Sequence, residues 1–470
     1  MTKSYDVAII GAGSAGLTAL REVRKQTDNF VLINEGPYGS TCARAGCMPS
    51  KALIEAANAF HRRKSLDAFG VSGAERLTVD IPAVLRRVRR LRDGFVEGML
   101  KLTDDLQDRS IAGRARFLEP QVLDVGERRL HAKKIIIATG SRPVVPKEWA
   151  ALGARMLTSD DLFDQETLPS NMAIIGMGGL GSEIAQSLAR LGIEVTGFDA
   201  ADYIAGLSDP HVNKLAVALL RAEFTLQLGL AAEPVIEGER IRVRAGGESV
   251  LVDKVLVALG RRPNVDQMGI ENLGVELDEH GVPPFNSRTM QIADLPVYIA
   301  GDANRHLPLL HEALDEGYIA GYNALRNQPV CFERRVPLAI VFTDPGIAVI
   351  GQAFDELNEN ETVIGEVDFS SQARARMAEV NYGLLRVYAD RNSGRLTGAE
   401  MCAPQGEHLA HLLALAVQRK LTVRELLSMP FYHPVLEEGL RTALRDAAGK
   451  LGDADVADLA CCDRPGADAL

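Results

Sequence analysis

Two cysteines, Cys42 and Cys47, are separated by four residues near the start of the chain. A regular helix would place their side chains on different sides and too far apart to form a disulfide bond. Gly46 precedes the second cysteine and permits a local distortion, which would allow a strained and reducible disulfide. The alternative is that the two residues are unrelated buried thiols. The spacing favours thiol–disulfide redox chemistry.

Two glycine-rich stretches indicate where nucleotides bind. Residues 11–16 read GAGSAG and residues 176–181 read GMGGLG, so the two stretches start 165 residues apart (176 minus 11). Each follows an apolar run and precedes a helical pattern, which predicts a strand, a tight turn and a helix whose N-terminus faces a pyrophosphate. The sequence therefore predicts two dinucleotide-binding units, with the loop glycines Gly11, Gly13, Gly16, Gly176, Gly178 and Gly181.

The residue that ends the second strand of each unit contacts the ribose of the nucleotide and so influences which nucleotide binds. In the second unit this residue is Asp199, and no arginine follows it closely. A carboxylate accepts hydrogen bonds from a ribose 2′-hydroxyl and repels a 2′-phosphate, which favours NADH over NADPH. In the first unit Asn34 occupies this position and Glu35 follows it. Either side chain could hold the ribose there, and we favour Glu35.

The remaining pattern predicts the domain organisation. Further apolar runs at 134–138, 254–258 and 297–300 end in glycine turns and lack alternation, as strands buried on both faces do. From about residue 336, short strand-like pieces precede a helix near 408–419, which indicates an α+β domain. We expect an α/β fold with two Rossmann-like domains and a C-terminal α+β dimerisation domain. The FAD-binding domain is expected to comprise residues 1–150 and 270–335, and the NAD-binding domain residues 151–269. The dimerisation domain is expected at 336–450, followed by a tail at 451–470.

Composition and charge exclude several classes of protein. The chain has 470 residues and a formal net charge of −11, which argues against nucleic acid as a partner. The basic run at 86–92 is expected to be a solvated helix face. No apolar run reaches membrane-spanning length, and the N-terminus leads directly into a predicted strand. We therefore expect a cytoplasmic protein with no membrane partner and no structural metal.

These motifs, in this order and spacing, resemble the pyridine nucleotide–disulfide oxidoreductases, and among them most closely the dihydrolipoamide dehydrogenases. The resemblance extends over nearly the whole chain. Besides the two glycine loops and the cysteine segment, it includes Ala138-Thr139-Gly140, Gly260-Arg261-Arg262-Pro263-Asn264, Gly301-Asp302, and His433-Pro434 with Glu438.

The resemblance implies a role for each matching residue. Cys42 would exchange with substrate sulfur, and Cys47 would face the flavin of a bound FAD. Lys51 and Glu183 would pair beside the flavin and tune it electronically. The other FAD-binding residues would be Gly11, Gly13, Gly16, Glu35, Thr139, Gly140, Asp302, Leu309, Leu310 and His311. NAD would be held by Gly176, Gly178, Gly181, Asp199 and Gly260.

His433 and Glu438 resemble the acid–base dyad of this family. An imidazole titrates near neutral pH and can accept the proton of a dithiol, while a carboxylate on its other nitrogen fixes the tautomer. Pro434 prevents a regular helix between the two residues, so a turn would set their geometry. In the family this dyad comes from the partner subunit. The resemblance thus implies a homodimer with shared active sites.

The implied activity is oxidation of a protein-bound dihydrolipoyl group by NAD+, with a lipoyl-bearing carrier protein or a small disulfide as the partner. The chain departs from the family pattern at Ser40, Arg44, Phe431 and Asn34, which leaves the substrate open. An NADH-dependent disulfide or mercuric reductase, a transhydrogenase-like flavoenzyme and a non-catalytic flavoprotein are the alternatives. The vicinal pair Cys461-Cys462 is expected to be incidental, with a redox relay or metal site as its alternative.

Overall fold

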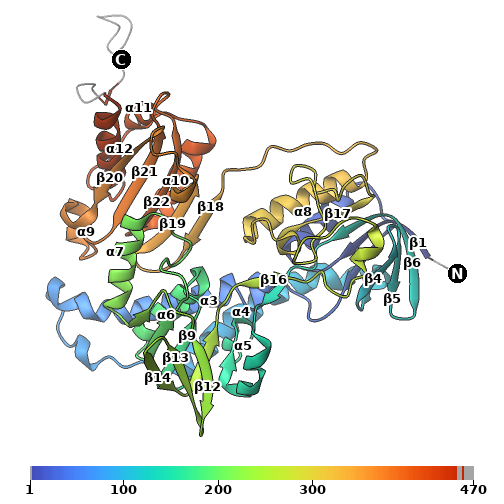
Figure 1. Cartoon of the computed structure of the whole chain (residues 1–470), viewed down its shortest axis with the longest axis horizontal. Coiled ribbons are helices and arrows are strands. Elements are labelled where there is room, and N and C mark those ends of the chain that lie inside the picture. The colour runs from blue at the N-terminus through green and yellow to red at the C-terminus, as the bar shows by residue number, and fades with distance from the viewer. Residues whose placement is uncertain (1–2, 453–457, 460–470) are drawn as a thin grey trace, which may run out of the picture. The chain divides into compact units, whose positions relative to one another are not determined.

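The structure is a computed structural model that describes residues 3–452 and 458–459. The chain forms two compact units (Figure 1). Unit 1 comprises the residues up to Leu53, Asp80–Leu168 and Leu256–Arg334. Unit 2 comprises Ile54–Val79, Pro169–Val255 and the residues from Arg335 onward. Each unit is therefore assembled from segments that lie far apart in the sequence.

Unit 1 is built on a seven-stranded sheet. Five strands run parallel in the order β3-β2-β1-β6-β17, and β5 and β4 extend the sheet from β6 in antiparallel fashion. The parallel part has the order of a doubly wound nucleotide-binding sheet, as predicted. The strands are β1 (Lys3–Ile10), β2 (Phe30–Asn34), β3 (Ser110–Ala112), β4 (Ala115–Glu119), β5 (Val122–Val125), β6 (Arg128–Ile137) and β17 (Val297–Ile299).

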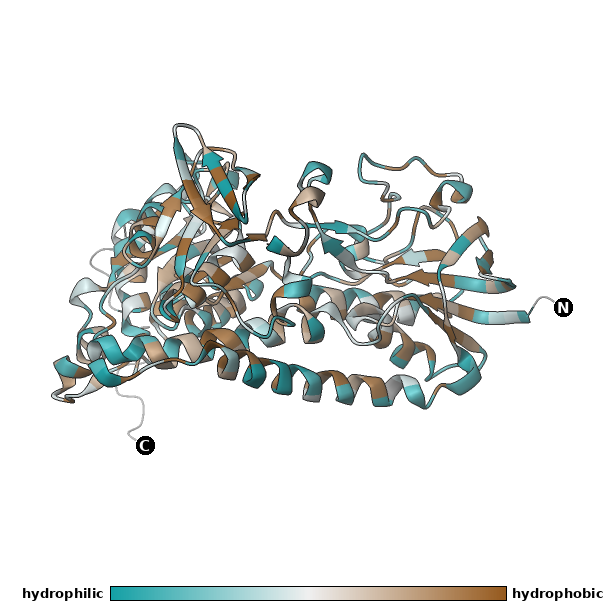
Figure 2. Ribbon diagram, turned by 90° about the horizontal axis from the view of Figure 1, so that it is seen from below, coloured by the Kyte–Doolittle hydropathy of each residue, from teal (hydrophilic) through white to brown (hydrophobic). Residues whose placement is uncertain are grey.

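The parallel strands of unit 1 are apolar because both faces of the sheet are covered. Val7 and Ile9 face one buried cluster, which includes residues of α1 and α8, while Ala8 and Ile10 face another. In Figure 2, brown apolar segments alternate with teal polar ones on the strands near the N-terminus. The helices are α1 (Ser14–Val23), α2 (Thr41–Arg44), α4 (Ile81–Asp104), α5 (Ser159–Leu162) and α8 (Leu310–Ala324), and α3 (Cys47–His61) begins in this unit. Short strands β7 (Ser141–Pro143) and β16 (Arg261–Pro263) pair antiparallel, and β8 is Met156–Leu157.

The first part of unit 2 repeats the strand–loop–helix–strand order of unit 1. β9, β10 and β11 are parallel, with α6 connecting β9 to β10. An antiparallel three-stranded sheet of β12, β13 and β14 follows. The elements are β9 (Asn171–Ile175), α6 (Gly179–Arg190), β10 (Glu194–Phe198), α7 (Pro210–Arg221), β11 (Thr225–Gln227), β12 (Glu233–Glu237), β13 (Arg240–Ala245), β14 (Glu248–Val252) and β15 (Lys254–Val257).

The second part of unit 2 is the expected α+β domain. Its antiparallel five-stranded sheet has the order β18-β19-β22-β21-β20. Helix α12 packs closely on β20, because a Cβ at Gly365 would lie only 2.2 Å from Ala443 O. The elements are β18 (Leu338–Val341), β19 (Gly346–Gly351), β20 (Thr362–Asp368), α9 (Ala373–Met377), β21 (Leu384–Asp390), β22 (Leu396–Ala403), α10 (Gly406–Gln418), α11 (Val423–Leu427) and α12 (Glu438–Leu451).

A buried arginine joins the two parts of unit 2. The Arg190 side chain at the end of α6 is 2% exposed. Its Nε and Nη2 bind the Glu223 carboxylate at 2.7 and 2.8 Å, and its Nη1 binds Asp344 Oδ2 at 2.9 Å and Asn58 Oδ1 at 2.6 Å. Burial of a guanidinium is tolerated here because each of these acceptors satisfies a donor.

We expect Arg190→Met to destabilise the protein by about 3 kcal/mol, because it leaves two carboxylates without their cation in a largely buried site. Urea unfolding followed by circular dichroism measures the change. Arg221→Met is the matched control, since Arg221 is exposed at the end of α7 and its Nε makes one 3.3 Å bond to a backbone carbonyl. Equal stability of the two variants would contradict this role for Arg190.

Candidate active site and nucleotide-binding sites

The first glycine loop joins β1 to α1 and leaves its backbone accessible. Gly11 has a φ of +110°, and a Cβ there would lie 2.2 Å from Ala138 O. A Cβ on Gly16 would lie 1.9 Å from Gly11 O, so neither position accepts a side chain. At Gly13 a Cβ would meet no atom within 4 Å, so the space before the α1 N-terminus stays open for an anion.

A cavity of about 480 Å³ lies beside this loop, entirely within unit 1. This is the size of a small-molecule or cofactor site. One lining residue, Thr139, has a buried Oγ1 with no hydrogen-bond partner among the described residues, whereas buried hydroxyls are normally satisfied. The cavity thus fits a polar nucleotide such as the adenosine diphosphate part of FAD. Its lining is Ile10, Gly11, Ile33, Asn34, Glu35, Gly113, Arg114, Ala115, Thr139, Arg142, Asn264, Asp266, Gln267 and Met268.

The two candidates for the ribose, Asn34 and Glu35, both line this cavity but differ in their contacts. Asn34 Oδ1 accepts a hydrogen bond from Ala12 N at 3.0 Å, and its Nδ2 donates to Gly36 O at 3.2 Å. The Asn34 amide therefore shapes the loop with both of its polar atoms. Glu35 is exposed and its carboxylate pairs with Arg114 at 2.6 Å.

The remaining residues predicted to bind FAD also lie in unit 1. Asp302 Oδ2 accepts a hydrogen bond of 2.6 Å from Ser141 Oγ, which brings Asp302 next to the segment that follows Thr139 and Gly140. Leu309 immediately precedes α8, and Leu310 and His311 are the first two residues of that helix. His311 Nε2 is buried and lies 3.7 Å from Glu312 Oε1.

Cys42 and Cys47 lie on two consecutive helices. Cys42 is in α2, and Cys47 is the first residue of α3. The backbone leaves helical geometry at Ala45, and a Cβ on Gly46 would lie 3.2 Å from Thr41 O. This break brings the two sulfur atoms into hydrogen-bond contact with each other. The predicted distortion at Gly46 is present, and both cysteines are half-buried.

The two thiols differ in their electrostatics. The pKa of Cys42 is raised, first because its thiol donates a hydrogen bond to the Cys47 sulfur, and then by burial and by the neighbouring Cys47 charge. Cys47 stands at the N-terminus of a 15-residue helix, whose partial positive charge favours a thiolate. Lys51 lies one turn further along α3 and lowers the pKa of Cys42 to a lesser degree. When the reduced pair loses one proton, these effects favour a thiol at Cys42 and a thiolate at Cys47.

We expect the pKa of Cys42 to fall in Cys47→Ala, because the hydrogen-bond acceptor and the neighbouring charge are both removed. Iodoacetamide labelling of Cys42 in the reduced, full-length protein, followed by peptide mass spectrometry, would reach its half-maximal rate at a lower pH than in the wild type. Cys331→Ser removes an exposed thiol and serves as the control that leaves this profile unchanged. An unshifted or higher midpoint in Cys47→Ala would contradict the assignment.

The second glycine loop repeats the geometry of the first. Gly176 has a φ of +101°, and a Cβ at Gly178 would meet no atom within 4 Å. Gly181 is buried in the first turn of α6. Asp199 Oδ2 accepts a hydrogen bond from Met177 N at 2.6 Å, as Asn34 does in the first loop, and its Oδ1 accepts one from Ala201 N at 2.9 Å. The carboxylate therefore ends β10 beside the loop, where a ribose-binding acid is expected.

Two predicted associations involve residues of different units. Glu183 is buried on α6 in unit 2, where its Oε1 accepts a hydrogen bond from Phe342 N at 2.9 Å. Lys51 lies on α3 in unit 1. Gly260 also lies in unit 1, with a φ of +88°, whereas the second glycine loop is in unit 2. The pairing of Lys51 with Glu183 and the NAD-binding role of Gly260 remain predictions.

His433 and Glu438 form a hydrogen-bonded pair in unit 2. His433 Nδ1 lies 3.1 Å from each carboxylate oxygen of Glu438, the first residue of α12. The bond to His433 is the largest cause that lowers the pKa of Glu438, and Val435 N donates a further hydrogen bond to it at 3.2 Å. The His433 side chain is 74% exposed. The Glu438 carboxylate thus fixes Nδ1 of the His433 ring. The other ring nitrogen, Nε2, points away from this hydrogen bond.

Sequence reasoning missed several residues of the first cavity. Arg114, Arg142, Asp266 and Gln267 line it, and no motif marks them as a group. Arg142 forms two bonds to Asp266, of 2.9 and 2.6 Å, and one of 2.7 Å to Asn264. The Arg142–Asp266 and Arg114–Glu35 pairs join residues 124 and 79 positions apart, so no local pattern reveals them.

The basic run of α4 matches its expectation only in part. Arg87 and Arg89 donate to the backbone carbonyls of Ala52 and Gln165, and Arg92 pairs with Asp164. Arg86, Arg87 and Arg90 are exposed, as expected of a solvated face, whereas Arg89 and Arg92 are only partly exposed and link α4 to neighbouring segments. Cys461 and Cys462 lie outside the described residues, as does most of the predicted tail. Across residues 3–452 and 458–459, the structure contains no helix with the length and apolar character needed to span a membrane.

Comparisons with known proteins agree with this geometry. A model of the pyridine nucleotide-disulphide oxidoreductase family matches residues 5–317, and a model of that family's dimerisation domain matches residues 337–444. A dihydrolipoyl dehydrogenase of Thermus scotoductus is 31% identical over 456 residues, covering 94% of this chain and 97% of the relative. A mercuric reductase of Shigella flexneri is 30% identical over 474 residues, covering 97% of this chain and 82% of the relative.

A solved structure shows the same fold. The Cu(II) complex of the HOCl-induced flavoprotein disulfide reductase RclA from Escherichia coli has a TM-score of 0.83 and 23% identity, covering 94% of this chain and 99% of its own. The matches confirm the predicted α/β fold with a dimerisation domain, the cofactors FAD and NAD, and FAD-dependent oxidoreductase chemistry on sulfur. The dimerisation domain supports the expected homodimer. This chain belongs to the pyridine nucleotide-disulphide oxidoreductase family.

Proposed function

We propose that this protein oxidises a protein-bound dihydrolipoyl group with NAD+, through FAD and the Cys42–Cys47 pair. The observation that carries the proposal is the hydrogen-bond contact between the two cysteine sulfurs at the N-terminus of α3, in the unit that holds the first glycine loop. The dihydrolipoyl dehydrogenase of Thermus scotoductus, similar over 94% of this chain, supports the choice of substrate. A cytoplasmic location fits such chemistry, because that compartment keeps thiols reduced.

The FAD would be held by the loop glycines of unit 1, by Glu35, Thr139 and Gly140, and by Asp302 with Leu309, Leu310 and His311. Bound there, FAD would supply the two-electron redox chemistry that links the enzyme dithiol to NAD. The open backbone at Gly13 and the unsatisfied Thr139 hydroxyl support this placement. Lys51, four residues after Cys47 on α3, would lie beside the flavin with Glu183.

The cysteine pair exchanges disulfides with the substrate. In the oxidised enzyme, one thiolate of the dihydrolipoyl group attacks Cys42 Sγ, and the Cys42–Cys47 bond breaks so that Cys47 leaves as a thiolate. The second lipoyl thiolate then displaces Cys42 and closes the lipoyl disulfide. The helix N-terminus stabilises the Cys47 thiolate, while Cys42 takes up a proton, in agreement with its raised pKa.

His433 would accept the proton of the substrate dithiol, and Glu438 would orient its ring and stabilise the imidazolium. We place this dyad in the active site of the partner subunit. The 74% exposure of His433 and the 79% exposure of the neighbouring Tyr432 support this placement, because both side chains would be available to a second copy of the chain.

NAD would bind the second glycine loop, through Gly176, Gly178 and Gly181, with Asp199 at its ribose and Gly260 nearby. Asp199 favours the binding of NADH over that of NADPH, since a carboxylate beside the ribose repels a 2′-phosphate. No lysine or arginine occurs among the residues from 200 to 213 that follow it, so no cation offsets that charge locally.

A second candidate is an NADH-driven mercuric or disulfide reductase. The mercuric reductase of Shigella flexneri, 30% identical, and the vicinal Cys461-Cys462 near the C-terminus favour it. The His433–Glu438 pair favours the dithiol reaction instead, because a carboxylate-held imidazole can accept the proton of a dithiol.

A substrate panel tests the choice. We expect the full-length protein to reduce lipoamide with NADH and to oxidise dihydrolipoamide with NAD+. These rates should be at least about tenfold above the rates with glutathione disulfide, thioredoxin or mercuric ion. Replacing NADH by NADPH should lower the rate of lipoamide reduction by a similar factor. Asp199→Asn should narrow the preference for NADH while leaving the lipoamide KM unchanged. Rapid turnover of mercuric ion with negligible turnover of lipoamide would overturn the proposal in favour of the second candidate.

A further inference from the structure

A buried carboxylate connects the dimerisation sheet to the nucleotide-binding part of unit 2. Glu400 lies on β22, and its side chain is fully buried. Its Oε2 accepts hydrogen bonds of 2.9 Å from Ser208 N and from Asp209 N. Its Oε1 accepts one of 2.5 Å from Ser208 Oγ and one of 2.9 Å from Phe354 N. Three of these four bonds hold the residues that immediately precede α7.

A second side chain of the same sheet fixes the start of α7. Asp209 is fully buried and caps this helix by accepting hydrogen bonds from His211 N at 2.9 Å and Val212 N at 3.3 Å. Arg386 Nη1, on β21, donates to both Asp209 oxygens, at 2.7 and 2.6 Å. Tyr388 OH donates to Asp209 Oδ2 at 2.9 Å. Helix α7 accordingly contacts β21 and β22 (Figure 1).

The chain between β10 and α7 connects this anchor to the second glycine loop. The Asn213 side chain of α7 accepts a hydrogen bond of 3.1 Å from Ile204 N and donates one of 3.1 Å to Asp202 O. Ala205 N donates a hydrogen bond of 2.8 Å to Met177 O, which lies inside the glycine loop. A displacement at the start of α7 is therefore transmitted to the loop through a short series of hydrogen bonds.

The backbone of this connection is strained. Ala205 has a φ of +55°, a left-handed conformation that non-glycine residues rarely adopt, and Gly206 follows with a φ of +80°. Strained residues persist where the surrounding contacts over-determine their conformation. Here the turn is bonded to the glycine loop at Ala205 and to Glu400 at Ser208. The Glu400 carboxylate is thus one of the contacts that keep the turn in place.

The need to join two parts of the chain does not by itself explain the Glu400 carboxylate. Removing a carboxylate from water is costly, and well-packed apolar side chains of similar volume join two parts of a protein at no greater cost. Hydrogen bonds to a carboxylate are short and directional, so they define where the bonded backbone donors lie. A buried carboxylate with four donors therefore suits the accurate placement of the segment that it holds.

We propose that Glu400 is a positioning residue for NAD. From the dimerisation sheet it fixes the turn before α7, and through Ala205 and Met177 it fixes the glycine loop. Arg386 assists by holding Asp209. The affinity for NAD thus depends on a carboxylate that belongs to the dimerisation domain. The inference rests on the proposed binding of NAD at the second glycine loop and adds the residue that keeps this loop in its binding conformation.

Glu400→Gln tests the inference in the FAD-loaded, full-length protein. Glutamine keeps the size of the side chain but presents an NH2 group where one oxygen accepted hydrogen bonds, so the anchor is weakened. We expect the KM for NAD+ to rise about fivefold, while the KM for dihydrolipoamide and the flavin content stay unchanged. The dissociation constant of ADP-ribose, which carries the ribose and pyrophosphate without the nicotinamide, should rise by the same factor in a calorimetric titration.

Amide hydrogen exchange measures the positioning directly. In Glu400→Gln without added nucleotide, peptides that cover 176–181 and 200–209 should exchange faster than in the wild type, because local opening becomes easier once the anchor is weakened. Peptides that cover the first glycine loop, 11–16, should exchange at the wild-type rate. Peptide mass spectrometry resolves these segments.

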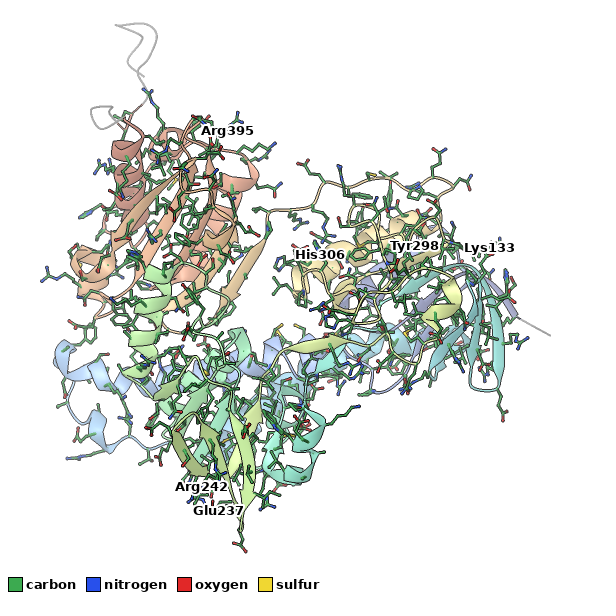
Figure 3. The ribbon with its side chains drawn as sticks, in the orientation of Figure 1. Lys133, Glu237, Arg242, Tyr298, His306 and Arg395 are labelled. Carbon is green, nitrogen blue, oxygen red and sulfur yellow. The ribbon has the colours of Figure 1, made fainter. Side chains whose placement is uncertain are left out.

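Glu425→Gln is the matched control. Glu425 also accepts hydrogen bonds from a backbone N–H and a hydroxyl, both of Thr422 and both at 2.8 Å. Thr422 forms a bridge with Arg395, which Figure 3 labels at the top of the dimerisation domain, whereas α7 lies at the lower side of this domain in the same view. Glu425→Gln should therefore leave the KM for NAD+ and the exchange of 176–181 unchanged.

Ser208→Ala is a milder variant that tests the same anchor if Glu400→Gln does not fold. It removes the 2.5 Å bond from the Ser208 hydroxyl but keeps the carboxylate and its backbone donors. The KM for NAD+ should rise about twofold. Thr422→Ala removes the equivalent hydroxyl bond to Glu425 and should leave this KM unchanged.

The outcomes separate the role of Glu400 from the proposed function. Unchanged affinities for NAD+ and ADP-ribose in folded Glu400→Gln, or in Ser208→Ala if the first variant does not fold, overturn the inference and leave the dithiol chemistry standing. Equal weakening in Glu400→Gln and Glu425→Gln also overturns it, because the effect would then reflect general destabilisation. If Asp199→Asn keeps the wild-type preference for NADH while Glu400→Gln weakens ADP-ribose binding, the proposed role of Asp199 fails and that of Glu400 stands.

Discussion

Cys47→Ser is expected to lower turnover of dihydrolipoamide by about 10³-fold or more, because the electron path through the enzyme disulfide is removed. The Cys47 sulfur is the hydrogen-bond partner of Cys42 and stands at the N-terminus of α3, where its negative charge is stabilised. A serine hydroxyl at this position can accept the same hydrogen bond but cannot form a disulfide. Steady-state kinetics with dihydrolipoamide and NAD+ measures the loss.

The same variant should retain its FAD, because the groups assigned to the adenosine diphosphate half lie at the first glycine loop and its cavity rather than at Cys47. Flavin content, measured after denaturation, is therefore expected to equal that of the wild type. Cys331→Ser is the matched control, since it removes an exposed thiol away from the pair and should leave turnover intact. Full dithiol turnover in Cys47→Ser would refute the proposed cycle.

His433→Gln is expected to lower dithiol oxidation by about 10²- to 10⁴-fold, the range for removal of a general base. Glutamine retains polar atoms near the position of the ring but cannot accept the dithiol proton at neutral pH. His408→Gln is the matched control, because His408 is also exposed and lies 3.8 Å from a glutamate carboxylate, Glu407. Steady-state kinetics with dihydrolipoamide and NAD+ measures the loss.

Mixing two inactive variants tests whether the dyad acts in the partner subunit. In a mixed dimer, one subunit carries Cys47→Ser and the other carries His433→Gln. If the histidine acts across the interface, the intact cysteine pair of the second subunit meets the intact His433 of the first, so one of the two sites works. Co-expression should then restore about a quarter of wild-type turnover, because about half of randomly assorted dimers carry one working site of two. No recovery, despite isolated mixed dimers, would contradict shared active sites.

The parts of the fold with local signatures were predictable from the sequence. The loops at Gly11 and Gly176 combine glycine spacing with apolar strands on one side and helical patterns on the other, and both glycines have a positive φ in a tight turn. The break between Cys42 and Cys47 was also predictable, because Gly46 interrupts an otherwise helical segment. Local backbone constraints of this kind can be read from a few consecutive residues.

Features that depend on long-range contacts were not predictable. The sequence favoured Glu35 over Asn34 but gave no view of their contacts, because the difference lies in partners such as Ala12 and Arg114. The buried contacts of Arg190 join residues up to 154 positions apart, and the strain at Ala205 has no sequence signature. The partial burial of Arg89 and Arg92 in the basic run of α4 was missed for the same reason, since their partners Gln165 and Asp164 lie more than 70 positions away.

The central claim is that electrons pass through a sulfur pair that opens and closes beside a flavin. Anaerobic reduction of the purified holoenzyme by two electrons, with the absorbance spectrum and free thiols recorded together, tests it most directly. The account predicts a new long-wavelength absorbance and a gain of about two free thiols per chain. A spectrum without such a band, with a constant thiol count, would contradict it.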